Sequence, residues 1–356
     1  MKQKQYSIPN VGIVTLPGDY NYGNRLQAYA LQTFLENIGA KATHIRPKSN
    51  RPIKNVIRNF LVKLNLKTSP FAKIVQAKKC NIKPFSDKYI CYSSRKRNFD
   101  FLIVGSDQVW NPNYLSSDDY FLRFAPINKR IAYAASFGVA TIPKDKEKIF
   151  SNYLKGIPYM SVREQQGTKI VKQLTGKKVP VVLDPTMLLP YSCWLELLEK
   201  EPFRCPKQKY LFVYSLHDLG KNELLISAYA KKHKLKIYRV MGDEYSDDMR
   251  IPSVVEFLHR INNAEAVFTD SFHASVFSIL FKTPFVVMKR RDADMSSRIV
   301  TLLKTVGMPN NLLSDSQKDI ESIISSTDFR ETSELIDTQR ASGAQFLKSI
   351  IRGVER

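Results

Sequence analysis

The stretch of sequence that identifies the fold is VGIVTLPGDYNYGNRLQAYALQTFLENIG, residues 11–39. It opens with a short apolar run rich in β-branched residues and then turns at PGDYNYGN. Apolar residues follow at helical spacing from Arg25 to Gly39, where the glycine is a typical helix stop. A buried strand, a polar turn and an amphipathic helix form the unit from which a parallel α/β sheet is built.

The same unit recurs along the rest of the chain. The pattern breaks near residues 188–209, where Pro190, Pro202 and Pro206 cluster with charged residues. We therefore predict two doubly wound, Rossmann-type domains facing a central cleft, residues 1–190 and 205–330, followed by a C-terminal helix over 331–356. Ligands of such sheets bind at the carboxyl ends of the strands. The further predicted strands are Ala42–Ile45, Phe101–Val104, Arg130–Gly138, Tyr159–Glu164, Val179–Pro185, Lys209–Leu216, Leu235–Val240, Ala264–Asp270 and Thr283–Met288.

Positive charge is concentrated in one segment of the chain. The net charge is +22, and residues 41–98 hold sixteen Lys or Arg but a single acid, Asp87. Residues 46–98 form a predicted basic insert of the N-terminal domain, in which cations and apolar residues mix at roughly helical spacing. The insert fits either solvated helices packed on the domain or a helix that lies on an anionic membrane surface. Nucleic acid is not expected as a partner, because no recognisable binding module accompanies the charge.

The sequence predicts a cytoplasmic protein without a metal site. It contains no run of about 18 apolar residues, and its first residues fit a buried strand better than a secretion signal. The four cysteines form no C-x-x-C pair, so free thiols in a reducing compartment are expected. The five histidines are scattered, with no pair at metal-binding spacing.

Polar residues cluster directly after two predicted strands of the N-terminal domain. Asn24 stands where a helix cap is expected, and the N–H groups of that helix can hold an anion. Asp107 is the candidate general base toward a sugar hydroxyl, although a helix-capping role for Ser106 and Asp107 explains the pattern too. The candidate substrate-binding residues here are Asp19, Asn24, Arg25, Ser106, Gln108 and Asn111, with Trp110 supplying an apolar face.

The C-terminal domain offers a cationic group of candidates. His273 stands in a predicted first helical turn, where an imidazole can bind phosphate and donate a proton or can be purely structural. The next strand ends at Lys289, Arg290 and Arg291, and Arg298 follows, so cations should converge on a small, highly charged ligand. Asp184, after the strand predicted at 179–185, gives a weaker signal that a helix start satisfies equally well.

Four motifs in this order, DYNYGNRLQ, VGSDQVWN, VVLDPT and TDSFHASVFSILFKTPF, resemble the polysaccharide pyruvyltransferase family over roughly Val11 to Met308. The resemblance implies a GT-B-like fold with the acceptor on the N-terminal side and the donor on the C-terminal side. It implies a metal-independent transfer of pyruvate, as a ketal, from phosphoenolpyruvate (PEP) to sugar hydroxyls, with PEP as co-substrate and no cofactor. His273 matches the family's histidine, and Arg298 takes the place of a basic residue that acts on PEP.

One position departs from the family's pattern. Members carry an Arg two residues before the histidine, where this chain has Ser271. Either Lys289, Arg290 or Arg291 supplies the charge, or the donor differs. The alternatives are a GT-B glycosyltransferase with a nucleotide-sugar donor and a non-catalytic sugar-binding scaffold. For the enzyme, the expected setting is bacterial capsular or exopolysaccharide synthesis, with a lipid-diphosphate-linked acceptor and peripheral contact with the inner face of the plasma membrane as further hypotheses.

Overall fold

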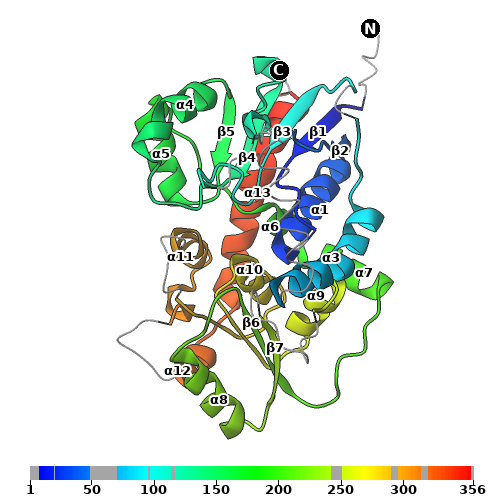
Figure 1. Ribbon diagram of the computed structural model, residues 1–356, viewed down its shortest axis with the longest axis vertical. Coiled ribbons are helices and arrows are strands. Elements are labelled where there is room, and N and C mark those ends of the chain that lie inside the picture. Colours follow the sequence, from blue (N-terminus) through cyan, green and yellow to red (C-terminus); the bar gives the residue numbers. More distant parts are fainter. Residues whose placement is uncertain are drawn as a thin grey trace.

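Two parallel sheets organise the protein (Figure 1). The computed structural model describes residues 8–19, 21–48, 70–94, 97–113, 117–241, 251–289, 296–313 and 320–353. The first sheet has the strand order β2-β1-β3-β4-β5 and the second has the order β7-β6-β8-β9. Every strand pair in both sheets is parallel, as the apolar strands separated by helices predict.

The first sheet is covered by helices on both faces. Alternate residues of a strand point to opposite faces, so Ile13 and Ile103 join the core cluster beneath α1, whereas Val14 and Val104 join the one beneath α4 and α5. Its strands are β1 (Asn10–Val14), β2 (Lys41–His44), β3 (Phe101–Val104), β4 (Arg130–Ala135) and β5 (Tyr159–Val162). Its helices are α1 (Tyr22–Asn37), α3 (Pro70–Tyr89), α4 (Lys144–Lys155) and α5 (Gln165–Thr175), with 3-10 turns at Asp118–Phe121 and Ile127–Lys129.

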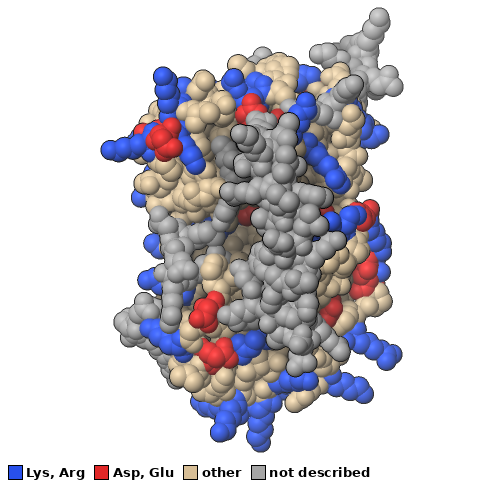
Figure 2. All heavy atoms as spheres, viewed as in Figure 1, with Lys and Arg blue, Asp and Glu red and all other residues tan. Residues whose placement is uncertain are grey.

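The second sheet contains β6 (Tyr210–Ser215), β7 (Lys236–Met241), β8 (Ala266–Thr269) and β9 (Phe285–Val287). Its helices are α8 (Asn222–Lys232), α9 (Val254–Asn262), α10 (Phe272–Leu280), α11 (Ser296–Thr305) and α12 (Ile320–Ser325), with a 3-10 turn at Pro309–Asn311. Lys and Arg side chains cover the end of the molecule where α8 lies (Figure 2).

One continuous core joins the two sheets. Tyr22 of α1 stacks on Phe257 of α9 with ring centroids 4.5 Å apart and donates a hydrogen bond to the carbonyl of Pro252 at 2.8 Å. The last helix, α13 (Arg330–Ile351), returns from the second sheet to the first (Figure 1). There Arg340 donates to the carbonyl of Met187 and Arg352 to that of Ile38, each at 2.9 Å. The two halves are therefore held against each other by aromatic packing and by this helix.

One sequence prediction about the connection between the sheets is wrong. Residues 179–185 form no strand; only Val181 bridges to Val162 of β5, because Pro180 has no N–H with which to extend the ladder. The chain then enters α6 (Pro185–Leu188). The stretch 188–209 holds a helix, α7 (Tyr191–Lys200), whose prolines stand at its cap and beyond its end, where they do not interrupt it.

The basic insert is described only in part. Residues 49–69 lie outside the described residues, whereas α3 forms the C-terminal part of the segment and packs against α1. The side chains of residues 76–81 are exposed or half-buried, whereas Ile82, Phe85 and Ser86 are buried. Within the described ranges, no helix has the length and hydropathy to cross a membrane.

Candidate active site

The carboxyl ends of both sheets meet at a group of buried charges, which we call the charged cluster: Asp107, Arg163, Asp184, His273 and Arg298. Asp107 follows β3 and Arg163 follows β5, so both leave the same edge of the first sheet. His273 lies in the first turn of α10, after β8, and Arg298 lies in α11, after β9. Each of the five is at most 9% exposed. The cluster thus exists only where the two halves of the molecule meet.

The ion pair between Arg163 and Asp184 is the centre of the cluster. Arg163 Nη1 lies 2.6 Å from Asp184 Oδ2, and both side chains are almost fully buried. Asp184 caps α6 by accepting hydrogen bonds from the N–H and the hydroxyl of Thr186 at 3.0 and 2.7 Å. The hydroxyl of Ser106 lies 2.9 Å from the same carboxylate. Burial by itself would raise the pKa of Asp184, but His273, Arg163 and the Thr186 N–H hold it well below its usual value.

Asp107 is presented to the cluster by a tight turn after β3. Gly105 has φ +137°, and a Cβ there would lie 2.0 Å from the carbonyl oxygen of Tyr133, so only glycine fits. Asp107 itself adopts a left-handed φ of 56°, a conformation that aspartate tolerates better than most residue types. Its carboxylate lies 3.6 Å from Arg163 Nη2 and 3.7 Å from Arg298 Nη1.

The pKa of Asp107 is lowered by its neighbours. Burial would raise it, but the charges of Arg163, His273 and Arg298 and a 3.4 Å hydrogen bond from the Asn24 side chain outweigh this effect. Asp107 is therefore a carboxylate at neutral pH, able to accept a proton from a hydroxyl.

His273 is held where two helix N-termini converge. Its Nε2 lies 3.6 Å from Asp184 Oδ2 and has no hydrogen-bond partner among the described residues. Its ring packs directly on Gly23 in the first turn of α1, where a Cβ would lie 1.9 Å from His273 Nδ1. The positive ends of α1 and α10 both favour an anion beside this imidazole.

The side chains of the turn after β1 make two sets of contacts, one with the charged cluster and one with α3. Asn24 reaches the cluster, but the cap of α1 is Asn21, which accepts from the N–H of Asn24 at 3.0 Å; the predicted capping role of Asn24 is therefore wrong. Arg25 is buried, donates to the carbonyl of Leu16 at 2.7 Å and lies 3.7 Å from Asp19. Asp19 in turn accepts from Ser86 of α3. Asp19 thus ties the turn to the basic insert, whereas Arg25 also donates from Nε to Asn24 Oδ1 at 3.1 Å and so supports the side chain that reaches Asp107.

The residues predicted as substrate-binding after β3 have different surroundings in the structure. Trp110 is completely buried, stacks on Phe121 and donates its indole N–H to the carbonyl of Tyr120, so it presents no face to a sugar and that prediction is wrong. No helix begins at this turn, which also removes the capping alternative for Ser106 and Asp107. Asn111 donates to Gln108 Oε1 at 2.6 Å.

The remaining predicted residues lie on the second sheet's side. Ser271 is buried and caps α10 by accepting from the N–H of Ala274 at 3.4 Å. Lys289 is exposed after β9, and Arg290 and Arg291 lie outside the described residues.

Sequence reasoning missed Arg163 and Glu164 as site residues. Arg163 stacks over the Phe272 ring, 4.3 Å from its centroid, and so reaches the segment that holds His273. Glu164 is buried and accepts from the N–H of Phe137 at 2.8 Å and from the hydroxyl of Ser136 at 3.0 Å, which fixes the loop after β4. A signal was available, because both residues directly follow an apolar strand, as Asp107 does.

Comparisons with solved structures support the fold. The chain is similar to a UDP-GlcNAc 2-epimerase from Neisseria meningitidis bound to UDP-GlcNAc, with TM-score 0.51, 11% identity and coverage of 97% of this chain and 100% of the other. The S. aureus MnaA–UDP structure matches with TM-score 0.51, 11% identity and 98% coverage of each chain. The Methanocaldococcus jannaschii UDP-GlcNAc 2-epimerase in complex with UDP-GlcNAc and UDP matches with TM-score 0.50, 14% identity and coverage of 97% and 100%. No curated protein sequence is found to match the chain.

These folds, together with the two parallel sheets, define a GT-B-like protein of two Rossmann-type halves, which confirms the predicted fold class. The charged cluster lies at the carboxyl ends of both sheets, where folds of this type bind their ligands, and is therefore the candidate site. The chain belongs to the polysaccharide pyruvyl transferase family, whose model matches residues 21–292. The family resemblance drawn from the four motifs is thereby confirmed, and the chain is assigned to a family of transferases.

Proposed function

We propose that this protein transfers pyruvate from PEP to two hydroxyls of a sugar, forming a ketal and releasing phosphate. The observation that carries the proposal is the charged cluster, in which His273, Arg163 and Arg298 surround Asp107 and Asp184. PEP carries a phosphate and a carboxylate on three carbons, so its site needs several cations and a proton donor within a small volume. Buried guanidinium groups suit both anionic groups because they donate in a planar fork.

Arg163 is the proposed substitute for the family arginine that Ser271 replaces. Its guanidinium lies over Phe272, between Ser271 and His273 in sequence, and is nearly fully buried. Its Nε and Nη2 have no hydrogen-bond partner among the described residues. The phosphate or carboxylate oxygens of PEP would accept hydrogen bonds from these buried N–H groups. Without a partner, each such group costs about 1–3 kcal/mol of stability.

The proposed chemistry assigns one proton transfer to each side of the cluster. His273 donates a proton to the methylene carbon of PEP, which leaves the central carbon electrophilic. A first sugar hydroxyl attacks that carbon and gives its proton to Asp107. Phosphate then leaves, a second hydroxyl adds to the same carbon, and its proton leaves with the phosphate. No metal or cofactor takes part in this scheme, and Arg163 and Arg298 stabilise the charge on the donor.

The proposed acceptor is a repeat unit of a bacterial capsular or exopolysaccharide, on the N-terminal side of the cluster, where Asn24 and Asp107 lie. A lipid-diphosphate-linked acceptor would bring the protein to the inner face of the plasma membrane, where the basic insert of residues 46–98 would meet anionic lipid. Binding to vesicles of anionic lipid at low salt tests this part. If no binding occurs at low salt, the membrane hypothesis fails and the transfer chemistry stands.

The test of the donor is thermal melting with millimolar PEP, next to a panel of nucleotide sugars, combined with an assay of phosphate release. We expect PEP to raise the melting temperature and the effect to disappear in Arg298→Ala and His273→Ala. Lys144→Ala, an exposed position on α4, is the control that should keep the response. A shift with a nucleotide sugar and none with PEP would replace the pyruvyl donor by a glycosyl donor. PEP binding that survives both substitutions would place the donor elsewhere.

A further inference from the structure

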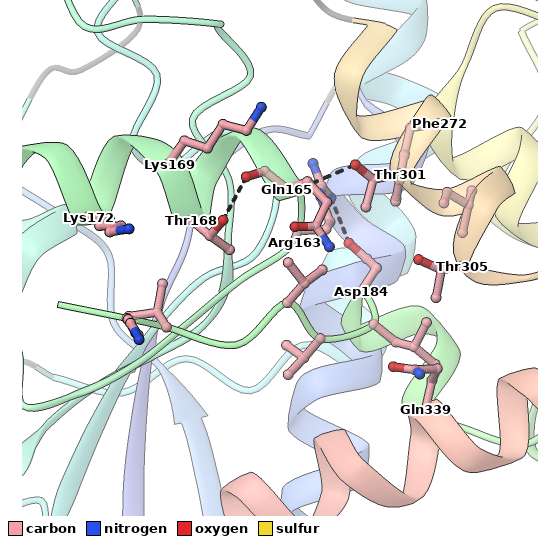
Figure 3. A pocket seen from close by; sticks show the side chains of 16 residues that line it. Arg163, Gln165, Thr168, Lys169, Lys172, Asp184, Phe272, Thr301, Thr305 and Gln339 are labelled. Carbon is pink, nitrogen blue, oxygen red and sulfur yellow. Dashed lines mark hydrogen bonds and ion pairs between the residues drawn. The ribbon is translucent and has the colours of Figure 1, made fainter.

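A cavity adjoins the ion pair of Arg163 and Asp184. It has a volume of about 560 Å³ and opens between α5 of the first half and α11 of the second; we call it the α5–α11 pocket (Figure 3). Arg163 and Asp184 form part of its wall, whereas His273, Asp107 and Arg298 do not line it. The pocket is therefore a separate compartment that shares one wall with the charged cluster.

The polar side of the pocket is strongly cationic. Lys169 and Lys172 stand on α5, and Lys178 stands on the extended segment that follows this helix. Asp184 is the one acid of the lining, and it is already paired with Arg163 at 2.6 Å. The lining thus contains three lysines and no further carboxylate to neutralise them. Such an excess of positive charge favours an anionic ligand.

Part of the lining is apolar. The segment from Val179 to Leu183 lines it with Val179, Val181, Val182 and Leu183, and Leu302 of α11 adds to the same surface. A ligand that fills the pocket must therefore combine an anionic group with an apolar or flat ring-like body. A volume of this size holds a molecule of about nucleotide dimensions.

The pocket also spans the junction between the two halves. The N–H of Gln165, at the start of α5, donates to the hydroxyl of Thr301 in α11 at 3.3 Å, and both residues line the cavity. Gln339 of α13 completes the wall (Figure 3). A molecule bound here contacts α5, α11 and α13 together and so stabilises their present arrangement.

We propose that the α5–α11 pocket binds an organic phosphate, with the phosphate on Lys169 and Lys172 and the body against residues 179–183. The bound molecule holds the two halves together and rests against the Arg163–Asp184 pair, through which it influences the charged cluster. Two sources share this chemistry, a nucleotide and an isoprenoid diphosphate. The proposal is independent of the identity of the pyruvyl donor.

Calorimetric titration with uridine monophosphate, geranyl diphosphate and inorganic phosphate tests the site. We expect one of the two organic phosphates to bind more tightly than inorganic phosphate, because inorganic phosphate lacks the body that contacts the apolar wall. The double variant Lys169→Ala/Lys172→Ala should weaken this binding at least tenfold. The matched control Lys144→Ala/Lys148→Ala removes the same charge from the neighbouring helix α4 and should bind as the wild type does.

The His273→Ala variant distinguishes binding in the α5–α11 pocket from binding at the charged cluster. Binding that persists in His273→Ala and falls in Lys169→Ala/Lys172→Ala places the ligand in the α5–α11 pocket. Binding lost in His273→Ala but kept in the lysine variant places it in the charged cluster and overturns the proposal. Absence of binding by both organic phosphates at millimolar concentration overturns it as well.

Discussion

Replacing Gly23 with alanine should push the imidazole of His273 out of the charged cluster. A methyl group built at Gly23 lies 1.9 Å from Nδ1, 2.2 Å from Cγ and 2.7 Å from Cβ of His273. These three nearest atoms all belong to one buried side chain, so the added methyl is accommodated only if the ring or the start of α1 moves.

Two opposing terms set the size of the effect. Alanine is a better helix former than glycine by up to about 1 kcal/mol, which favours the variant in the first turn of α1. Overpacking of a buried site costs about 1–3 kcal/mol and outweighs that gain. We expect a net loss of about 1 kcal/mol in the free energy of unfolding. Because a shift of about 1 Å in a catalytic group can cost about 100-fold in rate, turnover should fall far more than stability.

A double-mutant cycle with His273→Gly measures the clash directly. His273→Ala is not sufficient, because its own Cβ would remain 2.7 Å from the new methyl. In the His273→Gly background, Gly23→Ala should be neutral or stabilising in urea unfolding followed by circular dichroism. Gly167→Ala, in the first turn of α5 and 3.1 Å from Val162, is the control and should cost the same in both backgrounds. An equal cost of Gly23→Ala in both backgrounds would refute the reasoning.

Three further predictions concern the buried charges and the core. Asp184→Asn removes the closest counter-ion of the buried Arg163 guanidinium and leaves it only the looser contact with Asp107 at 3.6 Å. It should lower the free energy of unfolding by about 3–5 kcal/mol in urea titrations, and Arg163→Met/Asp184→Leu should restore part of this loss. Because the pKa values of Asp107 and Asp184 are lowered in the folded protein, both carboxylates stabilise the fold above about pH 4, and this stability is lost as the pH falls toward their folded pKa values. The melting temperature should therefore fall more steeply between pH 5 and about pH 3 in the wild type than in Asp184→Asn. Trp110→Phe should lower the melting temperature and leave the KM for the sugar acceptor unchanged, because the indole is a core group.

The part of the site that the sequence predicted follows from one rule of topology. Parallel strands bring their carboxyl ends to one edge, so polar residues after separate strands must lie near each other. Asp107, His273 and Arg298 were found in this way, and the structure does bring them into one cluster. The strands themselves could be predicted because they are apolar on both faces.

What the sequence did not predict depends on contacts that have no local pattern. Arg163 stands after a strand as Asp107 does, but the run YMSVRE was interpreted as continuous strand, so its last two residues received no role. Trp110 stands in an irregular loop, where no periodicity tells whether a side chain faces solvent or the core. The contact of Gly23 with His273 joins residues 250 positions apart in the sequence, and a single chain gives no sign of it.

The pairing of charges explains how the charged cluster can remain folded while it is buried. Arg163 is matched by Asp184, and Arg298 lies beside Asp107, so no guanidinium of the cluster depends on a ligand for its charge balance. The ion pairs differ in length. Among the ion contacts between residues of the cluster, the Arg163–Asp184 pair lies within 3 Å, whereas the others are 3.6–3.7 Å long. An incoming anion can therefore interact with His273, whose Nε2 lies 3.6 Å from Asp184, without breaking the central pair. In the proposed function, the two carboxylates keep the cations buried and oriented until the anionic donor binds.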